Sequence, residues 1–230
     1  MKRAWAMVLC ASLAAVGARQ SALGAQPEDA GTISGRVDIV TSPARRLATA
    51  GLYPGRTVAV QADRDVSEID NVLVFLDMPE RVPSAPRHAA IRQTNEEFVP
   101  HVVGLTVGSS VEFPNDDVIF HNVFSLSRAA TFDLGRYPQH VSKTRTFGTP
   151  GIVKVFCHLH SHMSAVVRVF AHPYFAAPNR DGRFVIPGVP IGRHRVTAWH
   201  ERAGEVTHEA AVDERGRAEL SFSLPIAESP

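Results

Sequence analysis

The feature that most constrains the fold is a succession of short apolar or alternating runs from Gly31 almost to the C-terminus. Turn-forming residues separate the runs, and no apolar stripe with a period of 3.6 residues extends beyond two helical turns. This pattern favours sandwiches or barrels, so we predict an all-β protein. The expected strands are 32–40, 56–62, 71–77, 102–107, 110–113, 121–125, 142–147, 151–157, 165–171, 182–186, 193–200, 205–212 and 218–223.

Turn and loop signals divide the chain further. Segments 179–182 and 213–216 both end in glycine and predict tight hairpins in the C-terminal part. Segments 44–55 and 80–88 indicate loops or linkers, and either is a candidate domain border. A chain of this length suits two β-sandwiches of about 100 residues each.

The N-terminus has the pattern of a secretory signal peptide over residues 1–25. Lys2 and Arg3 precede an apolar run at 4–16, and small residues precede the expected cleavage after Ala25. We therefore expect a periplasmic or secreted protein. No later run approaches the length of a transmembrane helix, so we expect no membrane span. Cleavage would leave Cys157 as the sole thiol, unable to form an internal disulfide.

The charge of the chain argues against nucleic-acid binding. Lysine and arginine number 24 and the acidic residues 23, giving a formal net charge of +1. Such a balance provides no basic stripe that could neutralise a phosphate backbone. We expect no nucleic acid among the partners.

One short segment carries the clearest chemical signal. Residues 156–163 lie between two β-branched runs, which predicts a hairpin whose loop begins at Cys157 and ends near Met163. Cys157, His160 and Met163 are three residues apart each time, a spacing that can direct a thiolate, an imidazole and a thioether at one point. His121, expected to start another strand, would supply a second imidazole. Two imidazoles, a thiolate and a weak axial methionine are typical of a blue-copper site.

Other interpretations of these residues remain open. A buried cysteine acting as a small hydrophobe, a structural zinc site or a cysteine hydrolase would each use Cys157. The zinc interpretation leaves Met163 unexplained, and a catalytic thiol at the end of a strand lacks the usual features that lower its pKa. His158 and His162 are expected to face solvent near the site, with docking or a secondary metal contact as the alternative.

Residues 90–172 resemble a known family. Cys-x2-His-x2-Met after a β-strand, with Phe-His-Asn-Val-Phe upstream, is similar to the cupredoxins, the plastocyanin- and amicyanin-like type 1 copper domains with a Greek-key sandwich. The resemblance implies one copper ion per chain and makes Asn122 the neighbour that ties the two ligand-bearing loops together. The implied copper ligands are His121, Cys157, His160 and Met163.

The resemblance extends beyond this domain. It is closest to bacterial exported proteins often called methylamine-utilisation-like, which continue into a segment like 173–224 here. That segment, with Asp181-Gly182-Arg183-Phe184, resembles a carboxypeptidase regulatory-like or transthyretin-like sandwich. The strands in 31–78 look like the opening of the same sandwich, which predicts a cupredoxin inserted into a discontinuous domain. In the alternative, 71–77 is the cupredoxin's own first strand.

These observations favour a carrier over an enzyme. We expect an exported mononuclear copper protein that carries single electrons between a redox donor and an acceptor protein, neither of them identified. A periplasmic copper carrier or sensor is the first alternative, because it would use the same ligands to hand the metal on. A cell-envelope binding module with structural copper is the second.

Overall fold

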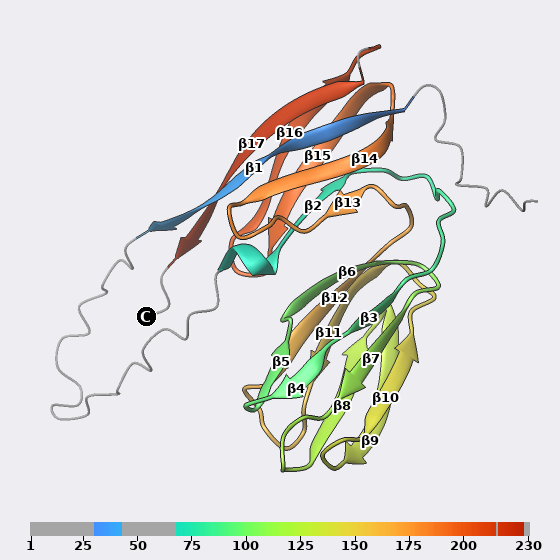
Figure 1. Ribbon diagram of the computed structural model, residues 1–230, viewed down its shortest axis with the longest axis vertical. Coiled ribbons are helices and arrows are strands. Elements are labelled where there is room, and N and C mark those ends of the chain that lie inside the picture. Colours follow the sequence, from blue (N-terminus) through green and yellow to red (C-terminus); the bar gives the residue numbers. More distant parts are fainter. Residues whose placement is uncertain (1–29, 43–67, 215, 228–230) are drawn as a thin grey trace, which may run out of the picture.

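The computed structural model describes residues 30–42, 68–214 and 216–227, which form two β-sandwiches, one above the other in Figure 1. These residues contain many strands, a 3-10 helix η1 (Glu68–Asn71) and no α-helix, which confirms the all-β prediction. Within the same ranges, no helix is long and apolar enough to cross a membrane. The expected signal peptide, 1–25, and the expected strand 56–62 lie outside the described residues.

The upper body in Figure 1, here named the split sandwich, combines strands from both ends of the chain. It consists of β1 (Ala30–Ser42), β2 (Val72–Leu76), β13 (Phe175–Ala176), β14 (Arg183–Pro190), β15 (Gly192–His200), β16 (Gly204–Val212) and β17 (Arg217–Ala227). One sheet has the order β14-β1-β17 and the other β13-β2-β15-β16. β1 runs parallel to β17 and antiparallel to β14, while β2 pairs with β15 and β13. The strands within 31–78 therefore pair with strands of the C-terminal segment.

Close packing of β1 against β17 depends on a glycine. A Cβ atom on Gly35 would lie 1.9 Å from the backbone oxygen of Leu220, so no larger residue fits without displacing the strand. On either side of Gly35, Ile33 and Val37 point into a core that also contains Phe184 and Phe222. The alternation of buried and exposed side chains along β17, and along β14 as far as Pro187, follows the period of two expected of half-buried strands.

The lower body, here named the inserted sandwich, is continuous in sequence. It consists of β3 (His88–Ala90), β4 (Arg92–Thr94), β5 (Glu97–Val99), β6 (Val102–Thr106), β7 (Ser110–Pro114), β8 (His121–Ser127), β9 (Ala130–Tyr137), β10 (Ser142–Thr146), β11 (Gly151–Phe156) and β12 (Ser164–Phe170). A five-stranded sheet, β6-β12-β11-β8-β9, faces a three-stranded sheet, β10-β7-β3, and β4 pairs with β5. Phe113, Phe147 and Val153 are among the fully buried core residues between the layers.

The two glycine turns of the C-terminal part are present, but the prediction that they form hairpins is wrong. Gly182 and Gly216 have φ values of +77° and +69°, as the turns require. The strands flanking each turn, however, lie in different sheets: β13 and β14 around the first, β16 and β17 around the second. Turn residues fix a reversal of the chain, whereas the identity of the strand partner depends on β1, which comes from the far end of the sequence.

An apolar seam joins the two sandwiches. Its buried residues are Leu73, Phe75, Val102, Val166, Phe170 and Trp199. Phe170, the last residue of β12, stacks on Phe175 with ring centroids 4.4 Å apart and planes at 19°. The seam thus lies where the chain leaves the inserted sandwich. It links the split sandwich to β12, which follows the loop from Cys157 to Met163, here named the histidine-rich loop.

Candidate metal centre

The loop predicted between Cys157 and Met163 closes a hairpin, as expected. β11 and β12 pair in register up to Phe156 opposite Ser164, so the loop begins at Cys157 and ends at Met163. The Cys157 N–H donates to the backbone oxygen of Met163 (3.4 Å), and the Met163 N–H donates to that of His160 (3.0 Å). These bonds hold the loop in a tight conformation at the end of the five-stranded sheet.

The second stretch reaches the loop through strand pairing. β8 lies next to β11, with Phe124 opposite Phe156. His121 is the first residue of β8 and is fully buried. Because β8 and β11 are antiparallel, the start of β8 lies at the end of β11, where the loop with Cys157 begins.

The structure brings His121, Cys157 and His160 together. The Nδ1 atoms of His121 and His160 are 3.1 Å apart, and the Cys157 Sγ lies 4.0 Å from the first and 3.9 Å from the second. The cysteine is buried, whereas the histidine of the loop is partly exposed. Two nitrogens and one sulfur therefore form a nearly isosceles triangle that opens toward the surface through His160.

The size of the triangle suits one transition-metal ion. The three donor atoms lie within 4.8 Å of one another, so one ion could bond to all of them at ordinary metal–ligand lengths. Among the described residues, no further histidine, cysteine or carboxylate belongs to the group. A closed structural zinc site takes four such donors, so the donor set fits the trigonal His2Cys arrangement of blue copper better.

Met163 occupies the end of the same loop. Its side chain is buried and belongs to the apolar core that also includes Cys157. The backbone bonds described above fix its position relative to both Cys157 and His160. The role of Met163 as a weak fourth donor stays a prediction from the sequence.

Asn122 connects the two ligand-bearing segments through its side chain. Its Oδ1 accepts a hydrogen bond from the backbone N–H of His158 (3.3 Å), and its Nδ2 donates to Asp133 (2.7 Å). Asp133 also accepts from the N–H of Gly135, and these two bonds hold its pKa below the usual value. Asn122 is buried, so loss of its side chain would leave polar groups of the loop without partners.

His158 and His162 lie outside the His-Cys-His group. The His158 ring stacks on Phe124, with centroids 3.7 Å apart, and its side chain is exposed. His162 is also exposed, and its Nε2 lies 3.7 Å from a carboxylate oxygen of Glu96. The His162 ring nevertheless lies beside the triangle, with its centroid 6.2 Å from that of the His160 ring.

Known proteins offer similarity in structure but not in sequence. No protein-family model and no curated protein matches the sequence. Part of the chain resembles solved cupredoxin structures. A copper-containing nitrite reductase from Thermus scotoductus SA-01 is 23% identical over 39% of this chain and 23% of its own, with a TM-score of 0.35. A purple cupredoxin from Nitrosopumilus maritimus is 21% identical over 36% of this chain and 99% of its own, with a TM-score of 0.33. A reduced amicyanin variant is 18% identical over 44% of this chain and 100% of its own, with a TM-score of 0.35.

The similarity has a limited extent. The match spans about a quarter of the length of the nitrite reductase. The amicyanin and the purple cupredoxin are matched over all or nearly all of their own length, but over less than half of this chain. The likeness therefore concerns one domain's worth of residues.

Asp117 is a polar residue of the centre that the sequence patterns do not single out. Its Oδ2 accepts a hydrogen bond from Nε2 of His121 (2.8 Å). Burial opposes ionisation of Asp117, but bonds from the Glu96 N–H, the His121 ring and the Asn95 N–H outweigh it and hold its pKa below the usual value. The spacing of four residues between Asp117 and His121 was the available signal, and it is not specific.

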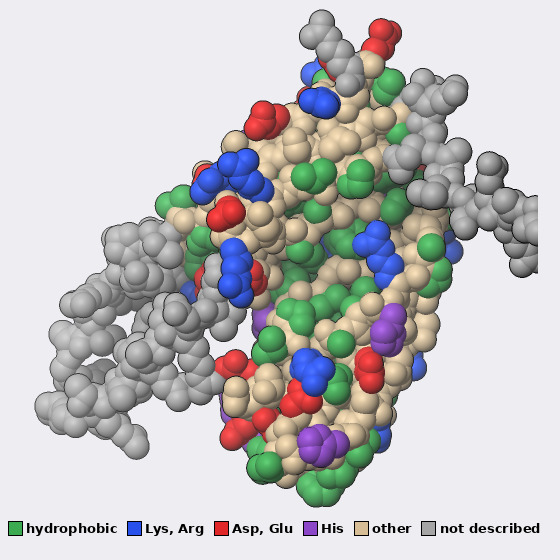
Figure 2. Space-filling view, in the orientation of Figure 1, with side chains coloured by type: hydrophobic (Ala, Val, Ile, Leu, Met, Phe, Trp, Pro, Cys, Tyr) green, Lys and Arg blue, Asp and Glu red, His purple; other side chains and the backbone are tan. Residues whose placement is uncertain are grey.

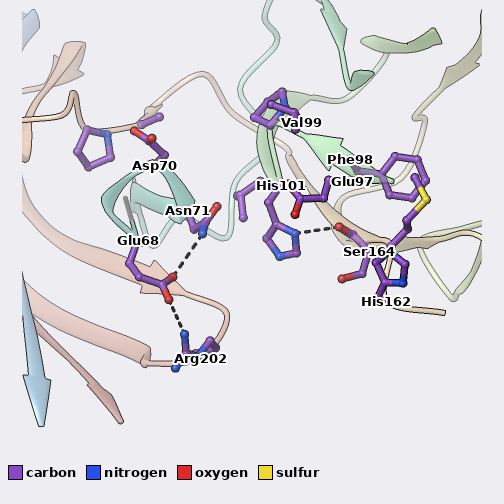
Figure 3. A pocket seen from close by; sticks show the side chains of 15 residues that line it. Glu68, Asp70, Asn71, Glu97, Phe98, Val99, His101, His162, Ser164 and Arg202 are labelled. Atoms are coloured by element: carbon purple, nitrogen blue, oxygen red, sulfur yellow. Dashed lines mark hydrogen bonds and ion pairs between the residues drawn. The ribbon is translucent and has the colours of Figure 1, made fainter. Parts of the chain in front are cut away.

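A cleft of about 680 Å³ runs beside the centre, between the two sandwiches. Figure 3 shows His101 hydrogen-bonded to Ser164 on one side and Glu68 bonded to Asn71 and Arg202 on the other. His162 and Met163 also line it, so the histidine-rich loop forms part of its wall. The second ring nitrogen of His101 lies 3.0 Å from a carboxylate oxygen of Glu201, which reaches across from the split sandwich.

The segment Trp199-His200-Glu201 lies at the junction of the two sandwiches. His200 is buried, and its Nδ1 accepts hydrogen bonds from the backbone N–H groups of Arg202 (3.1 Å) and Ala203 (3.3 Å). Its Nε2 bonds to Glu68 (3.0 Å). Trp199 packs in the seam between the sandwiches. The three residues therefore serve the turn and the interface rather than a metal.

Proposed function

We propose that this chain is an exported cupredoxin: a mononuclear type 1 copper protein that carries single electrons between redox partners. The observation that supports this most strongly is the triangle formed by His121 Nδ1, His160 Nδ1 and Cys157 Sγ. Soft sulfur favours Cu(I), imidazole nitrogens are acceptable to Cu(II), and bound copper would supply the one-electron couple between them. The proposed ligands are His121, Cys157, His160 and Met163.

The surroundings of the triangle support electron transfer rather than catalysis on a substrate. Cys157 and His121 are buried, and the partly exposed His160 gives the triangle its contact with solvent. Exposed apolar side chains flank the proposed ligands: Val118, Ile119 and Phe120 precede His121, and Leu159 precedes His160. An apolar surface around an exposed ligand edge suits brief docking of another redox protein.

Surface charge contributes little to the attraction or orientation of a redox partner. On the face shown in Figure 2, basic and acidic side chains are interspersed over both sandwiches. A surface of mixed sign steers no strongly charged partner over long range. We infer that close apolar contact near His160, rather than attraction between opposite patches, selects the donor and the acceptor.

The cellular location of this proposal depends on residues 1–25. Their basic start, apolar run and small-residue end have the features of a secretory signal. In the periplasm or outside the cell, cleavage would remove Cys10 and leave one thiol for the metal. A single thiol with no cysteine partner is protected from internal disulfide formation in an oxidising compartment.

The visible spectrum of the protein reconstituted with Cu(II) tests the proposal. We expect an intense thiolate-to-copper band at about 600 nm, lost in Cys157→Ser. His158→Ala and His162→Ala are matched controls from the same loop and should keep the band. If the unmodified protein shows no such band, or Cys157→Ser keeps it, the ligand set is wrong.

A second measurement separates an electron carrier from a copper carrier. We expect the protein to retain its copper through repeated cycles of oxidation and reduction in the presence of a Cu(I) chelator. Rapid loss of Cu(I) to the chelator would favour delivery of the metal to another protein instead.

A further inference from the structure

The Asp117 carboxylate lies on the side of the His121 ring opposite the donor triangle. His121 is fully buried, and its Nε2 lies 2.8 Å from Asp117 Oδ2, while its Nδ1 faces Cys157 and His160. The carboxylate is itself mostly buried, with a side-chain exposure of 15%. A buried imidazole is therefore held between an acidic group and the proposed metal position.

The carboxylate is held in place by two backbone groups of one other turn. The backbone N–H of Asn95 donates to Oδ1 (2.7 Å) and that of Glu96 to Oδ2 (2.9 Å). Both residues have positive φ values, +54° and +58°, in the turn between β4 and β5. This left-handed pair directs two consecutive N–H groups at one carboxylate.

Hydrogen bonds to Asn115 also hold the loop before His121. The backbone N–H of Asp117 donates to Oδ1 of the buried Asn115 (2.9 Å). Asn115 Nδ2 in turn donates to the backbone oxygens of Ile119 (2.9 Å) and Tyr137 (3.2 Å). Asp117 is thus anchored through both its backbone and its side chain before it meets His121.

We propose that Asp117 is a positioning residue that fixes the tautomer of His121 and strengthens its nitrogen as a metal donor. The inference rests on the proposed copper function. An ionised carboxylate can only accept a hydrogen bond, so the proton of the neutral ring lies on Nε2 and the lone pair on Nδ1 points at the metal position. The negative charge also makes the imidazole a better electron donor, which favours Cu(II) over Cu(I).

The competing explanation gives Asp117 a role in the fold alone, as the anchor of the turn at Asn95 and Glu96. That role would affect stability but would not select a tautomer of His121. The two explanations therefore differ in the state of the imidazole itself, which can be measured without copper.

Nitrogen-15 NMR of the metal-free, unmodified protein provides the first test. Long-range proton–nitrogen correlations report which ring nitrogen of His121 carries hydrogen. We expect the Nε2–H tautomer at neutral pH. A predominant Nδ1–H tautomer would overturn the inference, whatever the protein does with copper, and this measurement does not depend on the folding of any variant.

The second test compares Asp117→Asn with Asp116→Asn. Asp116 is the matched control because its carboxylate pairs with Arg92 at the surface and does not contact His121. In Asp117→Asn we expect the Cu(II) affinity to fall about 10- to 100-fold and the Cu(I) affinity to fall less, so the reduction potential rises. Asp116→Asn should change neither affinity.

The outcomes separate this inference from the proposed function. If the unmodified protein forms no copper–thiolate band, the copper function fails, while the tautomer still decides whether Asp117 orients His121. If the band forms but both variants bind Cu(II) as tightly as the unmodified protein, the role of Asp117 fails and the copper function stands. A parallel fall of the two Cu(II) affinities would also overturn it, because simple loss of charge would then explain the effect.

Discussion

The Arg168 guanidinium lies 4.1 Å from the centroid of the Phe75 ring, and this contact joins a strand of the inserted sandwich to a strand of the split sandwich. The rings of Trp199 and Phe170 lie within 5.6 Å of the same group, and Glu205 pairs with it. Burial lowers the pKa of Arg168, with Glu205 opposing that effect. The otherwise apolar seam between the sandwiches thus includes a cation that is largely shielded from water.

Replacement of Arg168 by alanine is expected to weaken the junction. The loss of cation–π contact and of packing along the side chain should lower the free energy of unfolding by about 1–3 kcal/mol. Urea unfolding followed by the fluorescence of Trp199 measures the change. The control is Arg193→Ala, whose side chain is 83% exposed beside Glu209 and should have almost no effect. Equal effects of the two substitutions would contradict the importance of the seam.

The two proposed histidine ligands differ in burial, and this predicts that added imidazole replaces only one of them. Both His160→Gly and His121→Gly should abolish the band at about 600 nm. Added imidazole should restore it in His160→Gly, because that side chain is partly exposed and its removal opens the metal position to solvent. His121 is fully enclosed, so imidazole should fail to restore the band in His121→Gly. Titration with imidazole while recording the spectrum checks this; rescue of both variants would argue against the geometry.

Asn122 offers a test of how the loop is held. Asn122→Ala leaves the His158 N–H and the Asp133 carboxylate without their bonds to this side chain, which should cost about 1–3 kcal/mol of unfolding free energy. We also expect faster loss of copper to a chelator. The exposed Ser161 lies in the same loop, so Ser161→Ala serves as the control. Unchanged stability in Asn122→Ala would show that the loop does not need this connection.

The pH dependence of stability should carry a contribution from His200. Burial lowers its pKa, with Glu68 opposing the shift, so the folded protein binds a proton less readily than the unfolded chain. Stability from this group is therefore present above about pH 6.5 and is lost as the pH falls below that value toward the folded pKa.

The contribution of His200 is measured on metal-free protein, so that release of metal at low pH does not add to the pH dependence of stability. We expect the urea midpoint to fall between about pH 7.5 and about pH 5.5, and to fall less in His200→Asn, whose Oδ1 can still accept the turn N–H groups. An identical decrease in the two proteins would show that other groups, such as the buried His172, produce the pH dependence.

The residues of the donor triangle, and Met163 in the same loop, could be singled out because their signals are local. Cys157, His160 and Met163 lie in one short loop between two apolar strands, so sequence spacing reflects spatial spacing there. His121 could be assigned because it begins a strand with a recognisable apolar pattern. Asp117 could not be, since its role depends on the turn at Asn95 and Glu96, whose position follows from tertiary packing.

The fold shows the same distinction between local and distant information. The existence of most long strands followed from alternation, but β9 was not predicted, because Gly135 with φ of +69° interrupts its pattern. The strands β3, β4, β5 and β13 were not predicted either, because two or three residues are too few to show an alternation. The partners of the strands after Gly182 and Gly216 were also mistaken. Both β14 and β17 pair with β1, and no feature near either turn encodes that partner.

The parallel alignment of β1 with β17 determines the order in which the chain can acquire its structure. β1 is synthesised before the inserted sandwich, but its partners β14 and β17 are synthesised after it. Thr32, for example, pairs with Arg217. The inserted sandwich has all its sheet partners within His88–Phe170 and can assemble earlier. A chain truncated after Phe170 would therefore contain every strand of the inserted sandwich but would leave β1 without β14 and β17, and such an unpaired strand is a target for proteolysis or aggregation.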